Sequence, residues 1–255
     1  MSLTDPLSFQ LYSARNFPPL EAQLRIIADA GFTNVEPYGA FYGDVAQARR
    51  LFTQYGLTAH SGHFGIDSLE SDLQRNLDIA GALGIRTIVA PYLPPESRPT
   101  DTAGWKSFGE RLAAVSAGVR KAGLRFGWHN HDFEFVALPD GSLPIEHLLV
   151  EGVLWEADVA WIIRAKADPK PWIKRYGKIM PLVHVKDIAP AGIKTDEDGW
   201  ADVGTGVVDW KTIWPLCVAA GAEIMVAEHD NPSDVSRFAT VSAQAMRQLA
   251  RGQAA

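Results

Sequence analysis

The sequence has little cysteine and no long apolar run. Cys217 is the only cysteine among 255 residues, which excludes a disulfide framework and a CxxC metal site. It lies in the apolar run WPLCVAAG, where it is expected to pack as a small hydrophobic side chain. No apolar run approaches the length of a membrane span, and no signal-like segment opens the chain. We therefore expect a cytoplasmic protein with no membrane partner.

An excess of positive charge is also missing. The net charge is −6, which counts against an extended nucleic-acid-binding face, so no nucleic-acid partner is expected.

A glycine-rich phosphate turn is absent as well. The segment after the first expected strand reads SARNFPP, unlike the turn that follows the first strand of a doubly wound open sheet.

The chain does contain a regular alternation of strand-like and helical stretches. Strands separated by helices run parallel, because each crossover returns the chain to the same edge of the sheet. Most of these strands are apolar on both sides, as in a barrel covered by helices. We therefore predict the α/β class and a single (β/α)8 TIM barrel over residues 1–255, a usual length for this fold. The expected strands are 9–13, 33–39, 57–65, 86–93, 124–135, 153–161, 180–188 and 223–228. The expected helices are 18–30, 44–55, 67–83, 102–122, 145–150, 170–176, 209–220 and 234–251.

The stretch LRFGWHNHDFEF, residues 124–135, holds the densest group of titratable side chains. It is expected to be a strand that runs into a loop. Strand alternation would direct His129 and His131 to the same side. Such a density suits a place where several strand ends converge on one ion. A polar loop with two surface histidines is the alternative.

Chemically active side chains recur at the expected strand ends, where TIM barrels carry their active sites. Six of the seven histidines lie at or just beyond such an end, and only His147 does not. Random placement would scatter them over helices too. The candidates are Glu36, His60, His63, His129, His131, Glu134, Asp158, His184, Lys186 and Glu228.

Four of these residues form a candidate metal site: Glu134, Asp158, His184 and Glu228 come from successive strand ends. Three carboxylates and one imidazole suit one divalent ion, Mn²⁺ first, with Mg²⁺, Co²⁺ or Zn²⁺ as alternatives. Other roles stay open for individual members. Asp158 could cap a helix or pair with Arg164, His184 could be a hydrogen-bonded core histidine, and a buried Glu228 needs a partner in any case.

A second set of side chains is expected to contact the substrate. Lys186 would share the face of His184 and bind a substrate oxygen, or else pair with a carboxylate. Aromatic side chains could form the pocket wall, although aromatics also fill cores. The expected substrate-binding residues are Glu36, His63, His131, Trp161 and Tyr92.

Five ordered segments resemble the sugar phosphate isomerase/epimerase superfamily, the xylose isomerase-like TIM barrels. They are WHNHDFEF, DVAW with the following KADP, HVKDI, DVGTGVVDW and AEHDNPSD. The resemblance implies one divalent metal held by Glu, Asp, His and Glu from the fifth to eighth strands, and it places Asp158, His184 and Glu228 on the last three. Glu134 is favoured as the fifth-strand ligand, with His129 as the alternative. Thr205 departs from the pattern, since relatives often have glutamate there.

These residues and the resemblance together predict a metal-dependent isomerase or epimerase acting on a keto-sugar or related polyol. A proton would leave the carbon next to the carbonyl, giving a metal-stabilised enediolate. Glu228 or Glu134 would act as the base and the other as the acid, while His63, His129, His131 and Lys186 would orient hydroxyls or relay protons.

The same residues are compatible with other functions. A dehydratase or lyase acting on a keto-sugar, inositol or 3-keto-glycoside would use the same site. An endonuclease IV-like hydrolase and a non-catalytic sugar-binding barrel are further alternatives. A homo-oligomer is compatible with the sequence.

Overall fold

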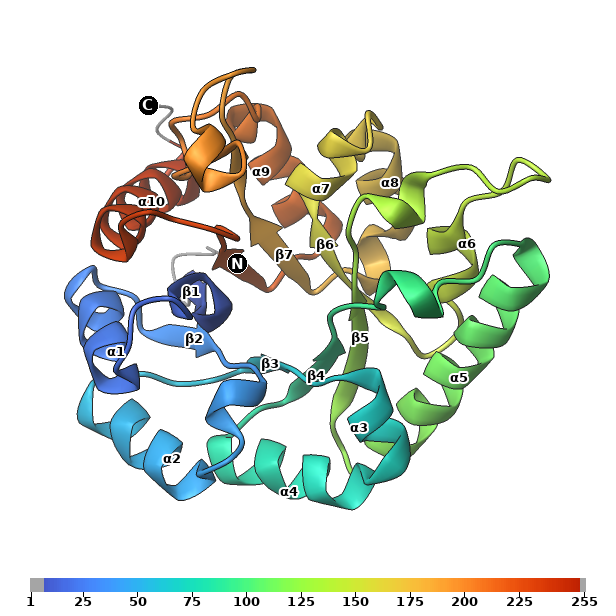
Figure 1. Cartoon of the computed structure of the whole chain (residues 1–255), viewed down its shortest axis with the longest axis horizontal. Coiled ribbons are helices and arrows are strands. Elements are labelled where there is room, and N and C mark those ends of the chain that lie inside the picture. Colours follow the sequence, from blue (N-terminus) through green and yellow to red (C-terminus); the bar gives the residue numbers. More distant parts are fainter. Residues whose placement is uncertain (1–6, 253–255) are drawn as a thin grey trace.

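Eight parallel strands and the helices between them form a nearly closed barrel in the computed structural model, which describes residues 7–252 (Figure 1). The strands follow one another in the order β2-β1-β10-β7-β6-β5-β4-β3. Three backbone hydrogen bonds connect the segments at the two ends of this series, from Val35 N to Thr58 O (2.8 Å), from Thr58 N to Thr33 O (3.0 Å) and from His63 N to Pro37 O (2.8 Å). The predicted TIM barrel is therefore confirmed. The barrel strands are β1 (Leu7–Gln10), β2 (Asn34–Glu36), β3 (Ser61–His63), β4 (Thr87–Ala90), β5 (Arg125–His129), β6 (Leu154–Asp158), β7 (Leu182–Val185) and β10 (Ile224–Ala227).

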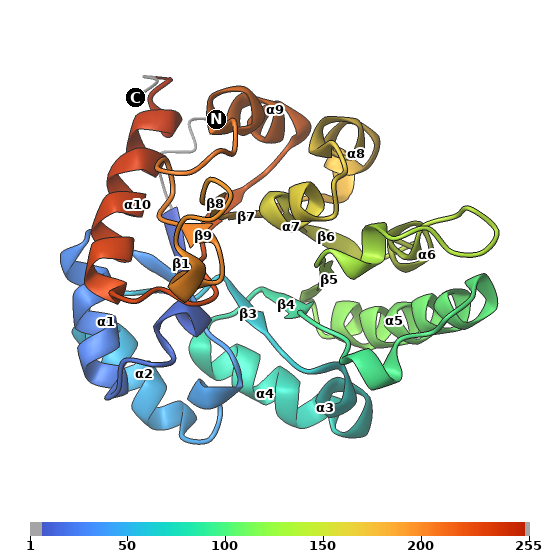
Figure 2. The same cartoon turned by 45° about the horizontal axis from the view of Figure 1, so that its top comes forward.

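A ring of helices covers the outside of the barrel (Figure 2). The expected helix 67–83 is two helices, because Asp72 interrupts it and its side chain accepts a hydrogen bond from Arg75 N at the start of the second. None of the helices among the described residues is long and apolar enough to cross a bilayer. The helices are α1 (Leu20–Asp29), α2 (Val45–Gln54), α3 (Ile66–Ser71), α4 (Leu73–Leu83), α5 (Thr102–Lys121), α6 (Pro144–Leu148), α7 (Val159–Arg164), α8 (Pro169–Tyr176), α9 (Trp210–Ala220) and α10 (Val235–Ala250).

Several strands end earlier than the sequence predicts, and this decides where side chains lie. The sixth strand stops at Asp158, whose carboxylate accepts a hydrogen bond from Trp161 N (2.9 Å) and caps α7. Trp161 therefore lies on a helix. His60 precedes β3 and contacts Arg86 (2.9 Å), so its expected place at the carboxyl end of a strand is wrong.

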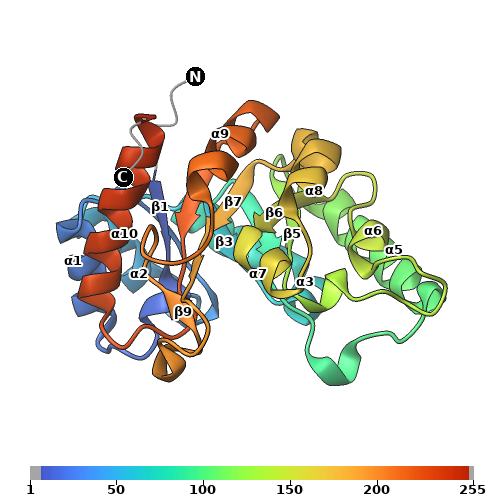
Figure 3. The same cartoon turned by 90° about the horizontal axis from the view of Figure 1, so that it is seen from above.

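The long segment between β7 and α9 is ordered by its own small sheet, β8 (Asp187–Ile188) with β9 (Trp200–Ala201). Buried Glu197 anchors it by accepting hydrogen bonds from Arg237 Nη2 (2.7 Å) on α10 and from Lys194 Nζ (2.9 Å). This segment and the connection between β4 and α5 project on the same side of the barrel (Figure 3). Both belong to the end where the strands finish.

Polar side chains fill much of the barrel interior. A small apolar cluster of Val89, Leu182, Ile224 and Val226 is separate from the main core. Every second side chain of a strand points into the barrel, and near the carboxyl ends these inward side chains become polar. Leu182, His184 and Lys186 form such a series, and all three are buried. Buried ionisable groups are unfavourable unless they are paired or bind an ion. The functional site is therefore expected at this end of the barrel.

Candidate metal and substrate site

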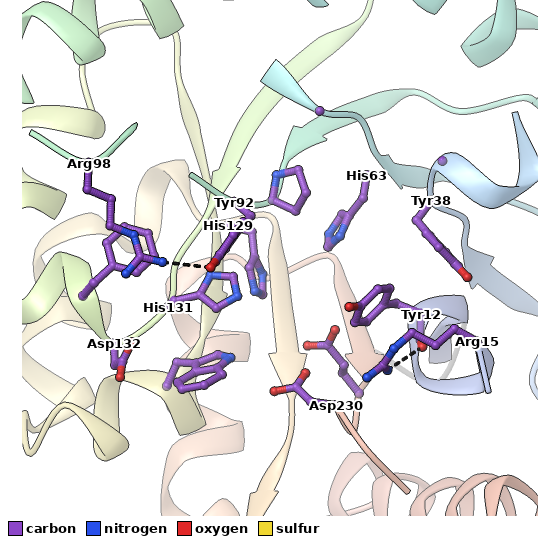
Figure 4. A pocket seen from close by; sticks show the side chains of 16 residues that line it. Tyr12, Arg15, Tyr38, His63, Tyr92, Arg98, His129, His131, Asp132 and Asp230 are labelled. Carbon is purple, nitrogen blue, oxygen red and sulfur yellow. Dashed lines mark hydrogen bonds between the residues drawn. The ribbon is translucent and has the colours of Figure 1, made fainter. Parts of the chain in front are cut away.

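A cavity of about 610 Å³ opens at the carboxyl ends of the strands (Figure 4). Its size lies within the range usual for small-molecule sites. The lining side chains come from loops and strand ends around the whole barrel. They belong to Tyr12, Arg15, Tyr38, Gly39, His63, Gly65, Pro91, Tyr92, Arg98, His129, His131, Asp132, Phe133, Trp161, Glu228 and Asp230.

One group of four buried residues, two of which line this cavity, could hold a metal ion. His129, Asp158, His184 and Glu228 each offer one ligand atom, and these atoms lie within 4.8 Å of one another. His184 Nδ1 is 2.7 Å from Glu228 Oε2, and His129 Nε2 is 3.9 Å from Asp158 Oδ2. Asp158 Oδ2 is buried and accepts no hydrogen bond of good geometry from residues 7–252, although it lies 3.1 Å from the charged Lys186 Nζ. Burial, the nearby His184 and further contacts keep the pKa of His129 well below its usual value, so its ring is neutral and can act as a ligand.

A second group lies beside the first and shares two of its histidines. Glu156 Oε2 is 2.7 Å from His63 Nε2 and 3.2 Å from both His129 Nδ1 and His184 Nε2. Each shared imidazole therefore directs one nitrogen to each group. A neutral imidazole has a single N–H, so a nitrogen that binds a metal leaves the other to donate to a carboxylate, a common arrangement around metals.

Glu36 lies in this second region and does not line the cavity. Its Oε1 is 2.9 Å from His184 Nε2 and 3.0 Å from His63 Nε2, and it accepts a hydrogen bond from Gln10 Nε2 (2.7 Å). Ser61 donates a hydrogen bond to its other oxygen. Glu36 is thus placed to orient histidines.

Lys186 contributes a fully buried positive charge to the site. Its Nζ lies 2.9 Å from Glu228 Oε2, 3.1 Å from Asp158 Oδ2 and 2.9 Å from Asp230 Oδ1. Burial works against this charge, but the three carboxylates outweigh burial and raise the pKa of the amine. Lys186 therefore stays protonated.

The buried carboxylates outnumber this one ammonium. Lys186 contacts Asp158, Glu228 and the partly exposed Asp230, whereas the charged contacts of Glu36 and Glu156 are with histidines. Burial opposes a charge on His63, yet Glu36 and Glu156 raise its pKa to about 9. The site thus draws in positive charge, as imidazolium or as a metal cation. A mixed nitrogen and oxygen donor set fits Mn²⁺, Co²⁺ or Zn²⁺.

Glu134 is the one expected metal ligand that the structure does not bring to the other three. Strand β5 ends at His129, and Glu134 lies in the short 3-10 turn Phe133–Phe135. Its Oε1 accepts a hydrogen bond from Trp128 Nε1 (2.9 Å) and its Oε2 from His131 N (2.8 Å). In the described structure it joins neither metal-binding group, whereas His129, the alternative, joins both.

Burial raises the pKa of Glu134 to about 8, against the two hydrogen bonds that favour its charged form. The folded state therefore holds a proton that the unfolded state releases near pH 4.5. The stabilising contribution is complete below that value and is lost as the pH rises through about 8. The free energy of unfolding should fall by up to about 1.4 kcal/mol per pH unit across this window. Denaturant unfolding of wild type and Glu134→Gln over pH 4–9 tests this, and an unchanged slope in the variant would contradict it.

The other expected residues divide by position. His63, His131, Tyr92 and Trp161, four of the five residues expected to bind substrate, line the cavity. Buried nitrogens of two of them, His131 Nδ1 and Trp161 Nε1, have no hydrogen-bond partner. A buried polar atom without a partner is unfavourable, so both are available to substrate oxygens.

Sequence reasoning missed several residues of the site. Glu156 lies two positions before Asp158, so alternation along β6 could have placed it inward. The same spacing relates Asp230 to Glu228. Tyr12, Arg15, Tyr38 and Arg98 lie on loops and 3-10 turns, where no periodic signal marks a direction.

The sequence matches a known protein family. The profile of the family described as xylose isomerase-like TIM barrel matches residues 24–251. A search of curated proteins finds no match.

Solved structures share the fold at low identity. A sugar phosphate isomerase/epimerase from Parabacteroides distasonis is 21% identical, with a TM-score of 0.80 over 94% of this chain and 93% of that one. A xylose isomerase-like TIM barrel protein from Mycobacterium smegmatis, in complex with magnesium, is 16% identical, with a TM-score of 0.74 over 100% of both chains. A probable 3-DHS dehydratase from Bacillus anthracis is 9% identical, with a TM-score of 0.72 over 94% of this chain and 98% of that one.

Proposed function

Since the chain belongs to the xylose isomerase-like TIM barrel family, we propose that it is a divalent-metal-dependent isomerase or epimerase of a keto-sugar or related polyol. The observation that carries the proposal is the meeting of four buried side chains from four strand ends, two of which, His129 and Glu228, line the cavity. His129, Asp158, His184 and Glu228 are the proposed ligands. Mn²⁺ is the proposed ion, because the donors mix imidazole and carboxylate.

An ion held there would polarise the carbonyl of a bound hydroxy-ketone and stabilise the negative charge that develops when the neighbouring proton leaves. Glu228 is the proposed base, because it lines the cavity beside the metal-binding group. Its contacts with His184 and Lys186 are made through Oε2, so Oε1 is the oxygen proposed to take the proton.

The remaining proposed roles follow from position. Burial lowers the pKa of His131 to about 3, so this residue faces the cavity as a neutral imidazole that can relay a proton. Return of the proton to the same carbon from the other face gives an epimer, and return to the neighbouring carbon gives an isomer.

Glu36 is a positioning residue that acts through His184 Nε2 (2.9 Å). Tyr92, His63 and Trp161 are proposed to contact substrate hydroxyls and ring faces.

Solvent deuterium exchange tests the base. Keto-sugars, inositol derivatives and 3-keto-glycosides are incubated in deuterium oxide with Mn²⁺ and either wild type or Glu228→Gln. We expect wild type to incorporate deuterium next to the carbonyl of its substrate, and the variant to lose most of this exchange. General-base catalysis contributes roughly 100- to 10,000-fold.

The matched comparison is Asp230→Asn, which alters the neighbouring carboxylate that also contacts Lys186 (2.9 Å). Undiminished exchange in Glu228→Gln, with exchange lost in Asp230→Asn, would transfer the role of base to Asp230. Absence of Mn²⁺ binding to wild type, with no rise in melting temperature, would overturn the metal-dependent function itself.

A further inference from the structure

One wall of the cavity carries an arginine that the proposed chemistry does not use. Arg98 lies between β4 and α5, beside Tyr92 and His131 (Figure 4), with its guanidinium over the ring of Phe133. His131 and Phe133 are stacked with their ring centroids 5.9 Å apart, and Tyr92 meets His131 edge-on at 5.0 Å. The guanidinium is thus part of an aromatic wall.

The orientation of Arg98 is fixed by contacts on several sides. Its Nε donates to Leu93 O (2.9 Å) and its Nη2 donates to Tyr92 Oη (3.0 Å). The guanidinium carbon lies 3.6 Å from the centre of the Phe133 ring. A planar group held in this way has little rotational freedom left to lose when a ligand binds.

Arg98 has no carboxylate within ion-pair distance among residues 7–252, although Asp132 lines the same cavity. Arg111, Arg125, Arg175 and Arg237 each pair with Glu or Asp. A guanidinium has five N–H donors, and only two nitrogens of Arg98 have protein acceptors. Donors are therefore left over at a cavity wall for an anion.

We propose that Arg98 binds a carboxylate of the substrate, so that the site takes a sugar acid. This inference rests on the proposed function, which puts the carbonyl end of the substrate at Glu228 and His129. Arginine matches the geometry of a carboxylate with two parallel N–H donors. A phosphate carries more negative charge than a carboxylate, so Asp132 and Asp230, which line the same cavity, would repel it more strongly.

Two buried nitrogens of residues that line the cavity have no hydrogen-bond partner among residues 7–252. His131 contacts Trp161 with ring centroids 5.2 Å apart, and His131 Nδ1 and Trp161 Nε1 are both buried without partners. Hydroxyl groups between the carbonyl and the carboxylate would satisfy both. Arg15 lies on the opposite wall, over the ring of Tyr12 (4.0 Å), and is not assigned this role.

Matched pairs of acid and neutral sugar test the proposal. D-glucuronate with D-glucose, D-galacturonate with D-galactose, and D-gluconate with D-sorbitol are titrated into the whole protein by calorimetry, with Mn²⁺ and after EDTA treatment. D-glucose 6-phosphate gives the phosphate comparison. The proteins are wild type, Arg98→Gln, Arg15→Gln and Arg86→Gln. Arg86 is the control, since it contacts His60 (2.9 Å) at the other end of the barrel.

We expect wild type to bind the acid of at least one pair about tenfold or more tightly than its neutral partner, as for a charge-assisted hydrogen bond. Arg98→Gln should lose this preference and keep its affinity for the neutral sugar. Arg86→Gln should keep both affinities, and Arg15→Gln, which alters the opposite wall, should keep the preference for the acid. The melting temperature of each variant checks its folding.

Several results would overturn the proposal. These are no acid preference in any pair, a preference that survives in Arg98→Gln or disappears in Arg15→Gln, or a phosphate that binds more tightly than the carboxylate. A preference that needs Mn²⁺ and ignores Arg98 would place the carboxylate on the metal. Failure of the proposed function would be visible separately, as absent Mn²⁺ binding, because the EDTA-treated arm tests Arg98 without a metal.

Discussion

Replacing Asp158 with asparagine is expected to remove divalent-metal binding and activity while leaving the fold intact. Asp158 Oδ1 caps α7 by accepting from Trp161 N (2.9 Å), and an asparagine side chain can keep that bond. Asp158 belongs to the metal-binding group, and its Oδ2 lies 3.1 Å from Lys186 Nζ, which keeps its contacts with Glu228 and Asp230 in the variant. An amide nitrogen in its place cannot be a ligand. Since altering residues behind a metal ligand already lowers affinity about 10- to 100-fold, loss of a ligand should exceed about 100-fold.

Calorimetric titration with Mn²⁺ measures this loss, and the dependence of the melting temperature on Mn²⁺ should disappear with it. Asp168→Asn is the matched control, because Asp168 caps α8 by accepting from Lys170 N (3.0 Å) and is not in the cavity. Wild-type Mn²⁺ affinity in Asp158→Asn would exclude Asp158 from the metal site. A fall in melting temperature without metal would instead show that the helix cap or the ion pair with Lys186 had been lost.

Replacing Lys186 with methionine should destabilise the metal-free protein by about 3–5 kcal/mol, the usual effect of removing one partner of a buried ion pair. Asp158, Glu228 and Asp230 would then face one another without the ammonium that contacts all three. Their mutual repulsion should make the variant depend on added cations. Urea unfolding with and without Mn²⁺ measures both effects.

Two further variants separate charge from packing. Lys186→Met with Asp230→Asn removes one carboxylate as well as the ammonium, and should recover part of the lost stability. Lys178→Met changes an exposed lysine and should have little effect. If the double variant were no more stable than Lys186→Met, electrostatic repulsion would not be the cause.

Strand alternation and the position of polar residues after apolar runs were enough to predict the barrel and the meeting of Asp158, His184 and Glu228. Those inferences needed only the direction of parallel strands. Glu134 could not be placed in the same way, because its position depends on β5 ending at His129 and on a 3-10 turn that brings it to Trp128 and His131. Such short-range turns leave little periodic trace in a sequence.

The missed residues show the same limit from another side. Glu156 had an alternation signal, two residues before Asp158, but its neighbours His63 and His184 come from other strands. Only the closed barrel reveals that they meet. Arg98 lies in a connection without regular structure, and its role depends on the absence of a carboxylate around it. Neither the meeting of Glu156 with these histidines nor the surroundings of Arg98 can be predicted from neighbouring residues in the chain.

The two histidines that are shared between neighbouring groups have a consequence for metal stoichiometry. A neutral imidazole has one nitrogen with a free lone pair and one nitrogen with a proton. When the free nitrogens of His129 and His184 bind an ion in one group, their N–H nitrogens point to the other group, where they can donate hydrogen bonds but cannot bind a metal. Two ions could be accommodated together only if His129 and His184 both lost that proton. A titration with Mn²⁺ should therefore saturate at one equivalent, and any second equivalent should bind far more weakly and release protons.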